Sequence, residues 1–365
     1  MSAKRIRQAG MSLVEVMVGV VIGLIGILII TQAYVSSDNF NRATLGEGGA
    51  QANGLIALYT IERDARMAGY GIANTATLGC GNLYWYYDSP SGTPVYSANV
   101  PGWSTNPSAL PAIAIAPLVI TTTAGQPDLI SVMYSSTGET IVPTSISGFN
   151  ASSSEVSVNG TQGFYENDFV VMVGASGCTL GLITQVQPGP SKLQLNPGNS
   201  APYNPPAWGS FPTTYASGDS IVNLGNPVVR TYSVGTVAST PKLRATDAQF
   251  TAGAGQTFDL VDGIVDIKAQ YGKDTGTDSV VDTWDATAPT DWLKVLAVRI
   301  AVLARVGNYE KPDASTGLCT ATTALPTWTG SSGRPFALPE GLPSCYRYRV
   351  FETTVPLRNV IWSAT

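Results

Sequence analysis

The sequence GMSLVE at residues 10–15 opens an apolar run, LVEVMVGVVIGLIGILIITQAYV, which extends from residue 13 to residue 35. The run is 23 residues long. A helix of this length covers about 34 Å at 1.5 Å per residue, enough to cross the hydrocarbon core of a bilayer. The preceding segment, MSAKRIRQAG at residues 1–10, contains three basic residues. Because basic residues stay on the cytoplasmic side, the sequence predicts a cytoplasmic N-terminus, with everything after Val35 across the membrane.

An acidic residue, Glu15, lies near the start of this run. Three simpler interpretations of the run are a secretory signal peptide, a single-pass anchor and a buried core helix. A signal peptide or an anchor gains nothing from Glu15, because an ionised carboxylate inside a bilayer costs on the order of 3 kcal/mol or more without a partner. The carboxylate therefore favours a helix that meets a cationic group in the membrane.

The segment from Gly10 to Glu15 resembles the processing site of type IV prepilins: a glycine, the cleavage point, four mostly apolar residues and a glutamate. The resemblance implies that a prepilin peptidase cleaves after Gly10 and methylates the new N-terminus at Met11, where the family usually has Phe. It also implies that Glu15 is an assembly residue that neutralises the terminal ammonium of a neighbouring subunit. Each charge is costly alone in lipid, and the two satisfy one another when helices stack with an axial offset.

The composition argues against catalysis and nucleic-acid binding. Only 12% of residues are charged, and the chain has 38 Gly and 24 Pro, which is typical of a secreted, loop-rich β protein. Histidine is absent, so the commonest general base and zinc ligand are missing. Removal of residues 1–10 leaves 17 basic against 25 acidic residues, a net charge of −8, which makes nucleic acid a poor partner. The sequence has no G-x-S-x-G, P-loop or G-x-G-x-x-G motif, and we expect no enzyme activity and no cofactor.

The helical pattern continues beyond the membrane segment. No proline occurs before Pro90, and apolar residues keep a helical spacing to about Met67, which predicts one helix of roughly 85 Å. Glycines at positions 46, 48, 49 and 54 each cost about 1 kcal/mol in a helix and favour a local break.

Beyond Gly71 the sequence changes to short strand candidates separated by turns rich in Gly, Pro and Ser. The candidates cover residues 129–134, 169–173, 182–186, 221–224, 228–234, 264–271 and 295–306. Two stretches, 89–111 and 188–212, are expected to be irregular, and the second is the best candidate for a seam within the head.

Two of the strand candidates show a clear pattern of faces. In 264–271 the alternation predicts one face turned to a core and the other to water. The core face is Val265, Ile267, Ala269 and Tyr271, and the water face is Asp266, Lys268 and Gln270. Residues 295–306 place Leu296, Val298, Ile300, Val302 and Ala304 on one face, which predicts a central strand packed on the helix.

Several stretches resemble PilW proteins. The first is the junction RMAGY at residues 66–70, which a cysteine, Cys80, follows shortly. The two patterned strands and the ending from Tyr346 to Asn359 also resemble that family. The likeness runs along most of the chain and is weakest in residues 81–165.

Four cysteines, Cys80, Cys178, Cys319 and Cys345, are an even number in a chain with an export signal, which favours disulfides. Four cysteines allow three pairings, and the sequence alone does not choose between them. The resemblance to PilW proteins implies the pairs Cys80–Cys178 and Cys319–Cys345, each contributing about 2 to 4 kcal/mol to stability.

An acidic segment, KDTGTDSVVD at residues 273–282, carries Asp274, Asp278 and Asp282. A calcium loop needs a D-x-D-x-D-G spacing, which this segment lacks. The spacing favours an ordinary acidic turn, and the sequence identifies no metal site.

These features predict an α+β protein with the type IV pilin fold, a long N-terminal helix packed on an antiparallel β-rich head. The expected parts are a leader peptide at 1–10, the transmembrane half of the helix at 11–35, its periplasmic half at 36–70 and the head at 71–365. The chain would span the inner membrane once before assembly and reach the cell surface in the pilus.

The resemblance implies a non-catalytic minor pilin that primes pilus assembly and sits at or near the tip. Its implied partners are the prepilin peptidase, other minor pilins, the major pilin, the inner-membrane assembly platform and a tip adhesin. Two alternatives stay open. One is a minor pseudopilin of a type II secretion system, and the other is a single-pass periplasmic binding protein whose helix is only an anchor.

Overall fold

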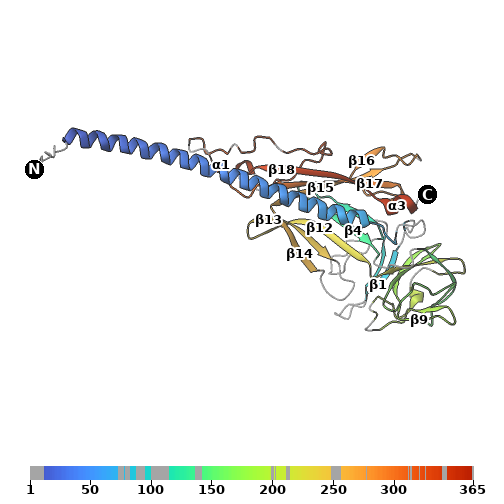
Figure 1. Cartoon of the computed structure of the whole chain (residues 1–365). Helices are drawn as coiled ribbons and strands as arrows, with labels where there is room; N and C mark the ends of the chain where they lie inside the picture. The colour runs from blue at the N-terminus through green and yellow to red at the C-terminus, as the bar shows by residue number, and fades with distance from the viewer. Residues whose placement is uncertain are drawn as a thin grey trace, which may run out of the picture.

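The structure, a computed structural model, describes residues 12–72, 78, 83–87, 95–99, 115–135, 142–198, 201, 203–210, 214–247, 256–276, 278–310, 312, 315–319, 321–324, 326–338 and 343–363. One long helix, α1 (Leu13–Met67), projects from a head of β-sheets, and a six-residue helix, α3 (Arg358–Ser363), lies near the C-terminus (Figure 1). The expected α+β class, with an N-terminal apolar helix on a β-rich head, is confirmed.

Helix α1 is continuous for 55 residues, about 82 Å at 1.5 Å per residue. The expected break at its glycines is therefore wrong, and the positions of the glycines explain why. A methyl group on Gly46 would lie 2.7 Å from Val306, and one on Gly54 would overlap the ring of Phe351, whereas Gly48 and Gly49 have no neighbours within 4 Å. Gly46 and Gly54 thus let the helix approach the sheet closely, and the packing offsets their low helix propensity.

The second half of α1 packs on a four-stranded antiparallel sheet. Its order is β16 (Thr283–Asp285), β15 (Ile264–Lys273), β17 (Val295–Arg305) and β18 (Tyr348–Pro356). Ala57, Ile61 and Ala65 of the helix are fully buried in one core with residues such as Ile267 and Ile300 of the sheet. Strand β17 pairs with β15 on one side and β18 on the other, so the predicted central strand is confirmed.

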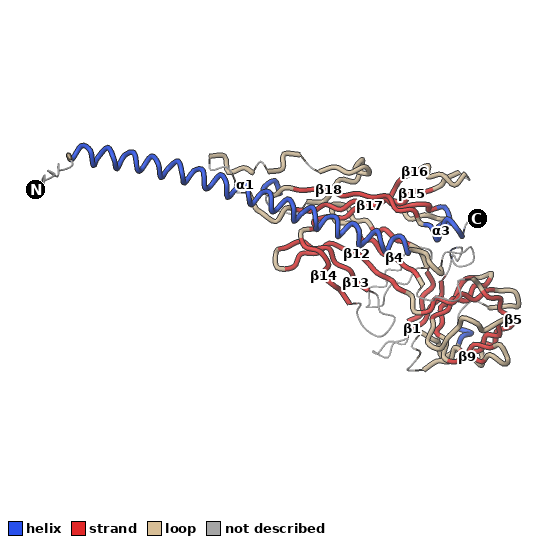
Figure 2. Tube along the Cα trace, in the orientation of Figure 1, coloured by secondary structure: helices blue, strands red, loops and turns tan. Residues whose placement is uncertain are grey.

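A second antiparallel sheet, of five strands, contributes to the same core. Its order is β14 (Gln256–Asp262), β13 (Thr240–Asp247), β12 (Val228–Val237), β4 (Leu129–Tyr134) and β3 (Leu118–Thr121). Figure 2 shows these strands and the four-stranded sheet on either side of the C-terminal half of α1. The predicted strands at 129–134 and 228–234 are therefore confirmed.

A third sheet forms what we call the distal lobe, at the end of the molecule away from the N-terminus (Figure 1). Its order is β2 (Val95–Asn99), β1 (Leu83–Tyr87), β8 (Gly177–Leu182), β7 (Phe169–Gly174), β11 (Ser220–Gly225), β5 (Thr144–Asn150), β6 (Glu155–Val158), β10 (Lys192–Gln194) and β9 (Gln185–Gln187). The pair β1–β8 is parallel, a departure from the expected antiparallel head. Strands β5 to β11 are an insertion between β4 and β12, which pair directly with one another.

The distal lobe contains one core of its own, and a second core is shared with Ile72, Met133 of β4 and Val229 of β12. Residues from the expected seam at 188–212 contribute to them: Leu193, Leu195 and Trp208 to one and Tyr203 to the other. The predicted strand at 182–186 is split, because β8 ends at Leu182 and β9 begins at Gln185. The predicted strands at 169–173 and 221–224 are confirmed.

The predicted water face of β15 is wrong, because Asp266, Lys268 and Gln270 are all buried. Arg334, from the segment 326–338, reaches this face and donates a hydrogen bond to the carbonyl of Ala269. The buried charges are matched in pairs. Lys268 lies 3.4 Å from Asp266, and Arg334 lies 2.6 Å from Asp128.

A register shift at the start of β15 also reassigns one residue of the predicted core face. Ile264, Ile267 and Ala269 pack in the core under α1, but Val265 packs on the opposite side with Trp328 and Phe336. Two cores therefore sandwich this strand, a feature that simple alternation does not reveal.

Candidate functional site

The first part of α1, Leu13–Asp38, is long and apolar enough to cross a membrane, with a mean hydropathy of 2.9. The core helix of a soluble protein can be equally long and apolar, but none of this segment is buried in the molecule. Leu13 is 77% exposed and Ile30 69%. Such an apolar surface must be covered by lipid or by other subunits.

Glu15 lies at the start of this segment and takes part in a capping box with Ser12. The backbone N–H of Glu15 donates to Ser12 Oγ at 3.2 Å, and the N–H of Ser12 donates to Glu15 Oε2 at 3.3 Å. The pair fixes the first residue of the helix. Sequence reasoning missed this role of Ser12, although Ser followed three residues later by Glu is a recognised start signal. Gly10 and Met11 lie outside the described residues.

The other end of α1 is held by the C-terminal segment. The helix ends at Met67, and Gly69 follows in a left-handed conformation with φ +80°, which a glycine adopts without strain. The side-chain amide of Asn359 donates to the carbonyls of Met67 and Ala68 at 3.3 and 3.1 Å. The two stretches that resemble PilW proteins, residues 66–70 and the ending through Asn359, thus meet in space.

A buried charge network fixes the helix to the five-stranded sheet. Asp64, 2% exposed, accepts hydrogen bonds from Tyr232 Oη at 2.7 Å and Arg230 Nη1 at 3.0 Å. Arg230 also forms a two-bond pair with Asp247, at 2.5 and 2.7 Å. Burial and the hydrogen bond to Asp64 raise the pKa of Tyr232. The hydrogen bond with Asp247 raises the pKa of Arg230, so the guanidinium stays charged at any physiological pH.

Sequence reasoning also missed this network. The feature of the sequence that could have revealed it is an acidic residue, Asp64, on the helix face that carries three apolar residues. These residues, Ala57, Ile61 and Ala65, are all fully buried. A carboxylate in that position needs a cationic partner. Nothing in the sequence pattern identifies the partner as Arg230, which is 166 residues away.

The cysteines form at least one of the expected disulfides. Cys319 is bonded to Cys345, with Cα atoms 4.8 Å apart and a sequence separation of 26; this is the pair that the PilW resemblance implied. Cys178, buried on β8, is also disulfide-bonded. Its expected partner, Cys80, lies outside the described residues.

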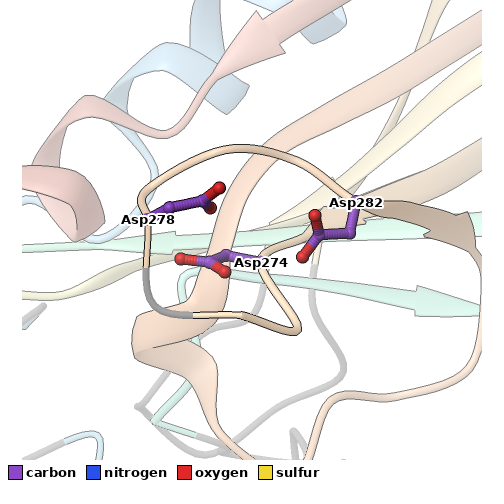
Figure 3. A group of neighbouring side chains, drawn as sticks. All are labelled: Asp274, Asp278 and Asp282. Atoms are coloured by element: carbon purple, nitrogen blue, oxygen red, sulfur yellow. The ribbon is translucent and has the colours of Figure 1, made fainter.

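The acidic segment after β15 folds into a loop that brings three carboxylates together. Asp274, Asp278 and Asp282 each offer an oxygen, and these oxygens all lie within 4.8 Å of one another (Figure 3). The sequence spacing favoured an ordinary acidic turn, but it does not show this convergence, which depends on how the loop closes between β15 and β16.

Comparisons with known proteins found two matching family models. Residues 231–359 match the family model described as Type IV Pilus-assembly protein W, and residues 5–31 match the prokaryotic N-terminal methylation motif. A solved type IV-like pilin from Thermus thermophilus is similar over 54% of this chain and 87% of its own, with 12% identity and a TM-score of 0.22. No curated protein matches the chain.

A methylation motif on an exposed apolar helix whose second half packs on a β-sheet defines a type IV pilin-like protein. Within that class, the match over residues 231–359 supports a PilW-like minor pilin. The matched region runs from β12 to α3 and leaves out strands β1 to β11, and with them the distal lobe.

Proposed function

We propose that this chain is a non-catalytic minor pilin that primes assembly of a type IV pilus and sits at or near its tip. The observation that carries the proposal is the exposed apolar half of α1 with the carboxylate of Glu15 at its start. A soluble protein would have to cover this surface, whereas a filament core covers it with the helices of neighbouring subunits.

Processing supplies the partner for Glu15. Cleavage after Gly10 removes the basic leader and frees an ammonium on Met11, which the peptidase then methylates. The carboxylate of Glu15 pairs with that group on an adjacent subunit. Among the described residues, the Glu15 carboxylate accepts a hydrogen bond from the N–H of Ser12, at 3.3 Å in an exposed position. This weak contact is easily exchanged for a charge pair in lipid.

The parts of the chain then take separate roles. Residues 11–35 anchor the subunit in the inner membrane with a cytoplasmic N-terminus, residues 36–70 connect the anchor to the head, and residues 71–365 form a periplasmic head. Other minor pilins and the major pilin contact α1, the assembly platform moves the subunit out of the membrane, and an adhesin at the tip is a further partner.

The distal lobe supports a position at the tip. It lies at the end of the head away from the membrane segment (Figure 1). A subunit stacked above this one would meet the lobe, whereas a tip subunit has nothing above it. Because strands β5 to β11 are inserted between two paired strands, the lobe adds bulk without altering the helix-bearing sheets.

Mass spectrometry and assembly assays test the proposal. The mature chain should begin with methylated Met11, and Glu15→Ala should insert into the membrane but not enter filaments. Ser12→Ala is the matched control, because it removes the capping hydroxyl and keeps the carboxylate, so it should assemble. Immunogold label on the head should gather at filament ends. An unprocessed N-terminus would contradict the cleavage after Gly10, and normal assembly of Glu15→Ala would contradict the role of that carboxylate in assembly. Label spread evenly along the shaft would contradict the position at the tip.

A further inference from the structure

The loop between β15 and β16 brings three carboxylates together. Asp274 directly follows β15, Asp282 directly precedes β16, and Asp278 lies between them; Figure 3 shows the three side chains directed toward a shared space. Among the described residues, none of the three forms an ion pair. Lys273 bonds to Asp285 at 2.7 Å, and Lys294 bonds to a backbone atom of the loop, the carbonyl of Gly276, at 3.4 Å.

One of the three carboxylates is buried with an unsatisfied oxygen. Asp274 is 8% exposed. Its Oδ2 accepts a hydrogen bond from the N–H of Ser279 at 3.1 Å, but within the described part of the chain its Oδ1 has no partner. A buried carboxylate oxygen without a partner is costly, and two like charges beside it increase the cost. A cation bound to Asp274 Oδ1 would offset this cost.

The loop holds the carboxylates around an open space. A methyl group on Gly276 would lie 3.5 Å from Asp274 Oδ1, 3.7 Å from Asp282 Oδ2 and 3.8 Å from Asp278 Oδ1. A larger side chain at this position would fill that space. Asp282 is oriented by Thr275, whose hydroxyl and N–H donate to it at 2.9 and 2.8 Å, and by the N–H of Gly276 at 3.0 Å.

We propose that this loop binds one calcium ion through Asp274, Asp278 and Asp282. Oxygens bound to one Ca²⁺ at about 2.3–2.6 Å are at most about 5 Å apart. The spread of 4.8 Å fits that limit. Mg²⁺ binds at about 2.0–2.1 Å, demands near-ideal octahedral geometry and keeps several waters, so a site of three carboxylates on a loop suits Ca²⁺ better. Metals that prefer nitrogen ligands find no histidine in the chain.

The expected affinity is modest. Three carboxylates in a partly exposed loop leave several coordination positions to water, and sites of this kind bind with a Kd of about 10⁻⁴ to 10⁻³ M. The bound ion would join both ends of the β15–β16 hairpin and satisfy the buried oxygen of Asp274.

Isothermal titration of the full chain in detergent micelles, after chelator treatment, tests the proposal. Asp278→Asn is the informative variant, because Asp278 is exposed and accepts a local hydrogen bond from the N–H of Val280 at 3.1 Å. We expect one calcium site in the wild type and at least a tenfold weaker Kd in the variant. Glu166→Gln, which removes an exposed carboxylate in the distal lobe, should bind calcium like the wild type.

Terbium luminescence gives a second readout, since Trp284 lies two residues beyond Asp282 and can sensitise a bound ion. Calcium should displace terbium from the wild type, and Asp278→Asn should show little luminescence. Absence of calcium binding at 10 mM, equal affinity of Asp278→Asn, or equal binding of Mg²⁺ would overturn the assignment. In the presence of chelator, the unfolding temperatures of Asp278→Asn and Glu166→Gln should equal that of the wild type. The calcium-binding measurements do not depend on filament assembly, so their result is separate from that of the proposed function.

Discussion

Gly54 of α1 lies directly against the ring of Phe351 of β18, so closely that a methyl group on the glycine would overlap the ring. Strand β18 is an edge of the four-stranded sheet and pairs with β17 over its whole length. The contact therefore sets how closely the second half of α1 can approach the sheet that carries it. A helical glycine that sequence propensity treats as a weakness is here a packing requirement.

Substitution of Gly54 should destabilise the head. Gly54→Ala forces Phe351 or the helix to move, and overpacking of this kind typically costs about 1–3 kcal/mol. Gly48→Ala is the matched control in the same helix, because it meets no atom within 4 Å, and it should stabilise the chain by up to about 1 kcal/mol. Denaturant unfolding of both variants measures the difference. Equal stabilisation by both alanines would show that the helix does not depend on this contact.

The buried carboxylate of Asp64 should be important for stability. Asp64→Ala leaves Arg230 without one of its two partners and Tyr232 Oη without its 2.7 Å acceptor. Breaking a buried pair on one side typically costs about 3–5 kcal/mol. Chemical unfolding followed by tryptophan fluorescence should show this loss.

Glu62 provides the comparison for Asp64, because it pairs with Arg66 on the same helix but in a more exposed position. Glu62→Gln should change the free energy of unfolding by no more than about 0.5 kcal/mol. A double-mutant cycle between Asp64 and Arg230 then gives the coupling energy. A coupling near zero would mean that the helix is held by apolar packing alone.

The general plan of this molecule follows from its sequence because its strongest signals are local. An unbroken apolar run and the Arg66–Tyr70 ending are both local signals, and the bounds of α1 agree with them. Strands such as 129–134 and 169–173 are likewise bounded by Gly, Pro and Ser turns.

Features that depend on distant segments could not be predicted. Asp266 and Lys268 of β15 read as surface residues until the segment 326–338 covers them, and Arg230 pairs with an acid 166 residues away. The convergence of the three aspartates likewise depends on loop closure and not on spacing. The alternation of apolar and polar residues along a strand identifies the face that is turned to a core. It does not show whether a distant segment covers the opposite face.

Loss of the Cys319–Cys345 bond should destabilise the C-terminal part of the head. The bond closes a loop of 26 residues, and a loop of this size contributes about 3 kcal/mol in the chain-entropy account. Cys319→Ser with Cys345→Ser removes the bond without leaving a free thiol. The double variant should unfold at lower denaturant than the wild type, and a reducing agent should move the wild type in the same direction. An unchanged midpoint in both experiments would contradict the prediction.

Stability should also depend on pH through Asp266, whose pKa burial raises to about 6. The unfolded chain releases this proton near pH 4. Between about pH 4 and 6 the folded state holds a proton that the unfolded state has lost, so raising the pH through this window lowers the free energy of unfolding, by about 2–3 kcal/mol. Above the window the folded protein carries a buried carboxylate, which Lys268, 3.4 Å away, and the N–H of Ala337 offset in part.

Asp266→Asn isolates this contribution, because the amide oxygen can still accept the hydrogen bond from the N–H of Ala337 and the side chain no longer titrates. The free energy of unfolding, measured with urea at pH 4, 5, 6 and 7, should fall less steeply with pH in the variant than in the wild type. Glu166→Gln removes an exposed carboxylate and should follow the wild-type curve. If wild type and Asp266→Asn have parallel curves, the carboxyl of Asp266 is already ionised throughout this range, and Lys268 fully compensates its burial.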